Sequence, residues 1–87
     1  MSVSELRRGE WARVVRIPDE SLRVQLLRFG IHDGSRVQCH ARLPLGPVVL
    51  KSGGQEIALG RQVARCIEVE SERALRAERR GERGLPS

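Results

Sequence analysis

The sequence predicts a single small, mainly β domain, in which short strands form a barrel interrupted by one short helix at about residues 20–29. Three observations lead to this fold class. Segments rich in β-branched residues are separated by glycine and proline, one segment has helical spacing, and no alternation of strands and helices indicates a parallel sheet. A chain of 87 residues makes one domain at most.

The first two expected strands are residues 10–17 and 36–42. Residues 10–17 are rich in β-branched side chains, and Pro18 ends the segment. In residues 36–42, Val37, Cys39 and Ala41 alternate with polar residues, which is typical of a half-buried antiparallel strand. The alternation predicts that Cys39 faces the core.

The second half of the domain is expected to hold a hairpin and a last strand. Residues 48–51 and 56–59 flank Gly53-Gly54, a hairpin signature. Residues 60–64 are expected to form one tight turn before a strand at residues 65–69.

The expected helix has a start, a face and an end in the sequence. Asp19 is a suitable N-cap. Leu22, Leu26 and Phe29 fall at i, i+4 and i+7, which predicts one face directed to the core. Gly30 stands where a left-handed C-terminal cap is expected.

These segments predict a domain at residues 1–70 followed by a tail at residues 71–87. The expected core residues are Val14, Ile17, Leu26, Val37, Ile57, Leu59 and Ile67. The tail is rich in arginine and has no continuous apolar stripe, so we expect a frayed helix or disorder there.

Charge and aromatic content bear on nucleic-acid binding. The net charge is +5, but acids are interleaved with the basic residues, and the only aromatic residues are Trp11 and Phe29. Proteins that bind single strands usually stack bases on several aromatic rings. We therefore expect no nucleic acid as a partner, although phosphate contacts through scattered arginines stay open.

The chain is expected to lie in the cytoplasm and to meet a membrane only through a partner. It has no apolar stretch of spanning length and no secretion signal in its first residues. Its two cysteines, Cys39 and Cys66, are too few for a disulfide framework.

The sequence offers little for catalysis or for metal binding, and no enzyme activity and no cofactor are expected. No phosphate-binding loop is present, and Cys39 and its neighbour His40 point to opposite faces of a strand. The weak candidates for metal ligands are His32, Cys39, His40 and Cys66, at spacings that suit neither zinc nor ferrous iron. A metal site shared between chains stays open.

The helix and the loop at residues 44–47 offer candidate partner contacts. Val24 and Leu27 lie off the predicted core stripe, and, if exposed, they form an apolar contact beside Arg23 and Arg28. Leu45 and Pro47 are the loop candidates. Trp11 is open to two interpretations, a partner contact or a partly buried ring at the rim of the barrel.

The order of several motifs resembles the FeoA family. The matching pieces, which cover roughly residues 4–70, are Leu6 with Gly9, Val14 with Ile17, the run 26–37, the segments 45–47 and 57–61, and the closing residues Ala64, Ile67 and Val69. The chain has Gly46-Pro47 where many members have Gly-Asp-Pro, and the arginine-rich tail lies outside the pattern.

The resemblance implies an SH3-like β-barrel with an inserted helix and a cytoplasmic accessory role in ferrous iron transport. Its implied partner is the cytoplasmic part of FeoB, a ferrous transporter with a GTPase domain. In this family the same domain is also fused to iron- and manganese-responsive repressors. Three other possibilities stay open: a freestanding module that binds or senses a transition metal, a basic nucleic-acid-associated domain, and a homo-oligomer formed through an uncovered strand edge.

Overall fold

The computed structural model describes residues 1–73. In chain order the elements are the 3₁₀ helix η1 (Val3–Glu5), β1 (Trp11–Arg16), α1 (Glu20–Leu27), β2 (Arg36–Arg42), β3 (Val48–Ser52), β4 (Gln55–Leu59), α2 (Arg61–Arg65) and β5 (Glu68–Ser71). The predicted mainly β fold with an inserted helix is therefore confirmed.

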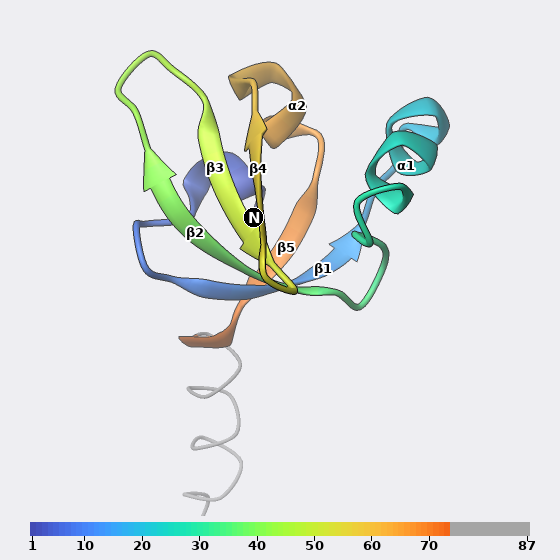
Figure 1. Cartoon of the computed structure of the whole chain (residues 1–87), viewed down its shortest axis with the longest axis horizontal. Helices are drawn as coiled ribbons and strands as arrows, with labels where there is room; N and C mark the ends of the chain where they lie inside the picture. Colours follow the sequence, from blue (N-terminus) through green and yellow to red (C-terminus); the bar gives the residue numbers. More distant parts are fainter. Residues whose placement is uncertain (74–87) are drawn as a thin grey trace, which may run out of the picture.

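The five strands form one antiparallel sheet in the order β4-β3-β2-β1-β5. The sheet curls on itself, so that in the view of Figure 1 β5 runs through the middle, close to β3 and β4. The ladders between β1 and β5 and between β2 and β3 each contain a register shift. Such irregularities bend a strand and increase its local twist, which helps a small sheet to curl.

One hydrophobic core fills the inside of this curled sheet. All seven of the predicted core residues are buried, and Cys39 is buried as predicted. The hairpin at Gly53-Gly54 is also confirmed, since both glycines have positive φ and Ser52 pairs with Gln55. Two adjacent residues in this conformation match the right-handed twist of the strands they join.

The N-terminal segment belongs to the core, which the sequence did not reveal. Val3 and Leu6 are fully buried. The amide of Val3 donates to the carbonyl of Ile67 (3.0 Å), and the amide of Val69 donates to the carbonyl of Met1 (2.8 Å). The first residues of the chain thereby cover the outer edge of β5.

Helix α1 begins as predicted and ends earlier than predicted. The Asp19 carboxylate accepts a hydrogen bond from the amide of Leu22 (2.9 Å), which confirms the N-cap. The helix ends at Leu27, and Gly30 takes the left-handed conformation (φ 76°) expected of a C-terminal cap.

The early end of α1 makes the prediction for Phe29 wrong. Phe29 lies beyond the last helical turn and is 50% exposed, while Leu26 is buried and Leu22 is only partly buried. Ile31 takes the expected core position instead, because its amide bonds back to the carbonyl of Leu26 (3.0 Å) and folds the chain under the helix.

The expected strand at residues 65–69 is also wrong in its first part. Residues 61–65 form α2, a single helical turn, and β5 begins at Glu68. Ala64 is the buried residue of α2, and Ile67, three residues later, is buried just beyond the end of this helix.

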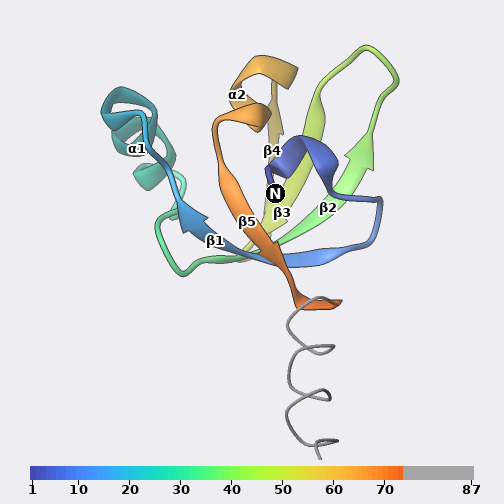
Figure 2. The ribbon, with the colours of Figure 1, turned by 180° about the vertical axis from the view of Figure 1, so that it is seen from behind.

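Helices α1 and α2 and the loop between β2 and β3 all lie at one end of the molecule, and β5 ends at the other (Figures 1 and 2). Within residues 1–73, no helix is long and apolar enough to cross a bilayer. Ser71 is the last residue of β5. The expected frayed or disordered tail falls almost wholly on residues 74–87, which lie outside the described residues.

Candidate functional site

The exposed face of α1 carries apolar side chains among arginines. Val24 is 53% exposed and Leu27 is 58% exposed, and both sit near the exposed Arg23 and Arg28 on the helix. Residues three and four apart are neighbours on a helix surface, so these four side chains form one continuous face. Phe29 follows directly and is half exposed. We call residues 23, 24, 27, 28 and 29 the helix patch.

The helix that carries the patch is attached to the hydrophobic core through its other side. Leu26 is the buried residue of α1, and Leu22 packs partly against the core. Val24 and Leu27 lie on the side of α1 away from Leu26. The described contacts give these two side chains no role in stabilising the fold. Exposed apolar groups gathered in this way often mark a contact with a partner.

A second exposed apolar surface is the loop between β2 and β3. Leu45 is 91% exposed at its tip and has a φ of 61°, the left-handed conformation that leucine rarely adopts. Leu43 is half exposed, and Pro47 is partly buried. A Cβ on Gly46 would approach the Cβ of Leu43 to 2.9 Å, so this tight loop requires a glycine there.

The two apolar surfaces lie at the same end of the molecule and do not merge. Figures 1 and 2 place α1 on one flank and the loop on the other, with α2 between them. The structure therefore brings Arg23, Val24, Leu27 and Arg28 together, but it leaves Leu45 and Pro47 apart from them. One partner could contact both only if it also passes over α2.

The four weak metal candidates do not gather into one site among the described residues. The His32 ring is 2.9 Å from the carbonyl of Asp33, and His40 Nε2 is 2.8 Å from Glu56 Oε1. Cys39 is buried, and burial raises the pKa of its thiol, whereas Cys66 is exposed. Among residues 1–73, no three His, Cys, Asp or Glu side chains meet in a group that could hold a metal ion.

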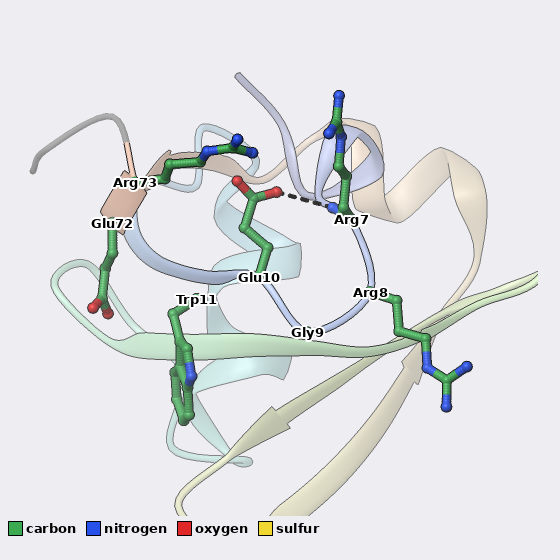
Figure 3. A pocket seen from close by; sticks show the side chains of 7 residues that line it. All are labelled: Arg7, Arg8, Gly9, Glu10, Trp11, Glu72 and Arg73. Carbon is green, nitrogen blue, oxygen red and sulfur yellow. Dashed lines mark hydrogen bonds between the residues drawn. The ribbon is translucent and has the colours of Figure 1, made fainter. Parts of the chain in front are cut away.

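A hollow of about 470 Å³ lies where the N-terminal turn meets the end of β5. Its lining residues are Arg7, Arg8, Gly9, Glu10, Trp11, Glu72 and Arg73. Figure 3 shows that these side chains diverge. Glu10 and Arg73 lie on one side of the start of β1, Trp11 and Glu72 lie on the other, and Arg8 points away from both pairs. The hollow has no convergent set of groups that could grip a small molecule.

This region instead ties the two ends of the described chain together. Glu10 Oε1 accepts from the amide of Arg7 (2.9 Å), and Glu10 Oε2 accepts from the hydroxyl of the buried Ser71 (2.7 Å). Arg36 binds the carboxylate of Glu72 through two nitrogens and lies 3.9 Å from the centre of the Trp11 ring. Trp11 is thus a partly buried ring at the rim, which fits one of its two interpretations.

The two hydrogen bonds that the Glu10 carboxylate accepts predict that the free energy of unfolding depends on pH in the acidic range. The Arg7 amide and the Ser71 hydroxyl hold the pKa of Glu10 below its ordinary value. The ionised form therefore stabilises the fold at neutral pH, and this contribution disappears as the pH falls below the ordinary glutamate range of about 4.3 and through the folded pKa. We expect Glu10→Gln to lower the free energy of unfolding by about 1 kcal/mol at pH 7.

Urea unfolding at neutral and at acidic pH checks this prediction. The difference between the parent and the Glu10→Gln variant should shrink as the pH falls below about 4. A difference that stays constant with pH would show that the ionised carboxylate has no special role.

Phe29 and Leu43 are among the exposed apolar residues that the sequence analysis did not place on the surface. Phe29 was assigned to the core because its spacing continues the helical face, although the adjacent Gly30 already signalled the end of the helix. Leu43 directly precedes Pro44, and a residue before proline is restricted in conformation. Gly30 is the local signal that could have placed Phe29 on the surface, whereas the restriction before Pro44 does not predict the exposure of Leu43.

Comparisons with known proteins agree on the class of fold. A crystal structure of an iron uptake regulatory protein (FeoA) is similar with 28% identity and a TM-score of 0.75, over 82% of this chain and 96% of that one. The solution structure of iron(II) transport protein A from Clostridium thermocellum is similar with 33% identity and a TM-score of 0.74, over 82% of this chain and 45% of that one. No curated protein matches the chain.

A third similar structure describes the fold in words. It is that of FeoA from Stenotrophomonas maltophilia complexed with zinc, described as a prokaryotic SH3 domain protein, with 24% identity and a TM-score of 0.69 over 80% of this chain and 89% of that one. The curled five-stranded sheet with its inserted helix is therefore a small SH3-like domain. The sequence profile of the FeoA domain matches residues 1–71. The chain belongs to the FeoA family, which is associated with ferrous iron transport.

Proposed function

We propose that this chain is a small cytoplasmic accessory protein of ferrous iron uptake. It binds the cytoplasmic part of a FeoB-type transporter, which carries a GTPase domain, and it meets the membrane through that partner. The observation that carries the proposal is the helix patch, where Val24 and Leu27 are more than half exposed beside Arg23 and Arg28. Membership of the FeoA family supports a partner within iron transport.

The chemistry of the helix patch suits a partner segment with apolar and acidic side chains. Burial of apolar side chains such as Leu27 supplies affinity. The flanking arginines suit carboxylates, because the guanidinium group binds them in a fixed fork geometry. Leu45 and Pro47 form a secondary contact in this proposal, since the loop lies at the same end of the molecule.

A binding protein changes its partner's activity only through a difference in affinity for the partner's states. If the helix patch fits one state of the GTPase region better than another, binding shifts the transporter toward that state. No metal bound to this chain is required for such an effect, and no cofactor takes part in it.

Capture of the transporter tests the proposal. Tagged protein is incubated with membranes from its own iron-starved host, and the retained proteins are identified. We expect recovery of a GTPase-bearing ferrous transporter, and we expect Leu27→Asp to reduce that recovery strongly. Loss of a hot-spot contact costs about 2 kcal/mol or more, which corresponds to roughly thirtyfold in affinity.

The matched control is Gln25→Asp, which adds the same charge at an exposed position outside the helix patch, on the side of α1 away from Leu27. Both variants must first be shown to keep the parent's thermal unfolding. If Leu27→Asp and Gln25→Asp behave alike, the helix patch is not the contact. If the folded parent protein retains nothing from membranes that contain the transporter, the accessory role itself is wrong.

A further inference from the structure

The two edges of the sheet differ in how they are covered. The outer edge of β5 is covered by the N-terminal segment, through the bridge between Ser2 and Glu68 and the hydrogen bonds of Val3 and Val69. The other edge is β4, and within the described part of the chain its one pairing partner is β3. Among residues 1–73, no backbone hydrogen bond joins the outer edge of β4 to another element.

The register of the hairpin defines which backbone groups this edge presents. In an antiparallel ladder, residues alternate between those whose amide and carbonyl bond the neighbouring strand and those whose groups point away. Ser52 and Gln55 close the two-residue turn as a bonded pair. Counting from this pair, the alternation directs the backbone groups of Glu56 and Ala58 outward.

The β4 edge lacks several of the features that usually prevent strand pairing, but it is a short strand and carries the exposed Glu56, which lies 2.8 Å from His40 of the same chain. Residues 55–59 contain no proline and no lysine, and the register with β3 runs without a bulge. Ile57 and Leu59 face the core, while Glu56 and Ala58 are exposed on the outer face. A second strand can therefore extend the sheet at this edge without burying a like charge.

We propose that a second copy of this chain pairs with the β4 edge, antiparallel and about a two-fold axis at Ile57. In this register Glu56 of each copy lies opposite Ala58 of the other, and both residues present their free backbone groups to one another. A self-complementary patch of this kind is what a two-fold dimer needs. A register that places Glu56 opposite Glu56 brings like charges together and is disfavoured.

The register predicts opposite effects for two substitutions at Ala58. Ala58→Lys places a cation opposite Glu56 of the second copy twice in each dimer, and Ala58→Glu places an anion there. Each cross-strand charge pair changes stability by about 0.2–1 kcal/mol, so two pairs change the dimer dissociation constant by about two- to thirtyfold, downward for Lys and upward for Glu. If the net charge of +5 determined dimer stability instead, Ala58→Lys would raise the dissociation constant and Ala58→Glu would lower it, because added positive charge increases repulsion between copies.

Sedimentation over a wide concentration range, with the full chain and without the transporter, measures these constants. The double variant Glu56→Lys with Ala58→Glu restores the opposite charges in swapped positions, so it should recover the dimer that Ala58→Glu weakens. Thermal unfolding of each variant shows that the fold is kept.

Three results would overturn the proposal: a parent chain that stays monomeric at every concentration, equal weakening by Lys and Glu at position 58, or no recovery in the double variant. The test is independent of the proposed function, because it uses no transporter. A monomeric chain whose Ala58→Pro variant fails to capture the transporter would assign the β4 edge to a strand of that partner instead.

Discussion

Replacing Leu26 by alanine is expected to lower the free energy of unfolding by about 2–5 kcal/mol, the range for truncating a buried leucine. Leu26 is the buried residue of α1, and its carbonyl accepts the amide of Ile31, which folds the chain under the helix. A cavity at this point therefore weakens both the core and the attachment of α1.

The neighbouring Leu27 provides the control for this prediction. Leu27→Ala removes the same atoms from a side chain that is more than half exposed, and such surface changes usually stay within about 0.5 kcal/mol. Urea unfolding of the two variants measures the difference directly. If both substitutions cost the same, α1 does not sit on the sheet as described, and the helix patch loses its basis.

Replacing Leu6 by alanine should have an equally large effect, about 2–5 kcal/mol. Leu6 is fully buried although it lies outside every strand and α-helix. It follows η1, whose last residue Glu5 accepts a hydrogen bond from the amide of Ser2 (2.6 Å). The truncation leaves a cavity beneath a segment that cannot easily collapse, because backbone hydrogen bonds attach it to β5 and to the preceding residue Ile67.

Leu45→Ala is the matched control for Leu6→Ala, because Leu45 is almost fully exposed. It should leave the unfolding midpoint nearly unchanged. Relief of the left-handed leucine conformation gives no gain, since alanine has the same restriction at positive φ. A small effect of Leu6→Ala would mean that the N-terminal segment is not part of the cooperative core.

The features that the sequence predicted well are those that local chemistry determines. Gly53-Gly54 allows the positive φ of a two-residue hairpin, and Asp19 supplies the acceptor that a helix start requires. The alternation in residues 36–42 placed Val37 and Cys39 in the core correctly. Each of these signals depends on a few adjacent residues, so no knowledge of the tertiary structure was needed.

The features that the sequence missed depend on contacts between distant residues. Nothing near Val3 reveals that its backbone partner is Ile67, more than sixty residues later in the chain and just before β5. The end of α1 is similar, since both Phe29 and Ile31 are apolar and only the path of the chain after Gly30 decides which is buried. Tertiary packing, rather than propensity, settles such alternatives.

The candidate site was partly accessible from the sequence. The helical spacing places Val24 and Leu27 off the core stripe, and the sequence predicts an apolar contact there if both are exposed. Both side chains are exposed in the structure. Their role in binding stays a prediction, because a partner's surface leaves no periodicity in this chain. The separation of the helix patch from the loop that holds Leu45 could not be predicted from the sequence, because it depends on the position of α2 in the tertiary structure.

The position of β5 has a consequence for synthesis of the protein on the ribosome. Among the described strands β5 is translated last, and it pairs with β1, which is translated before the other strands, and with residues 1 and 2. At about 5–20 residues per second, β1 waits roughly 3–12 s before residues 68–71 are made. Throughout that interval the inner residues of β1 and the N-terminal Val3 and Leu6 lack their final neighbours. The nascent chain is therefore most in need of protection by chaperones just before its last strand leaves the exit tunnel.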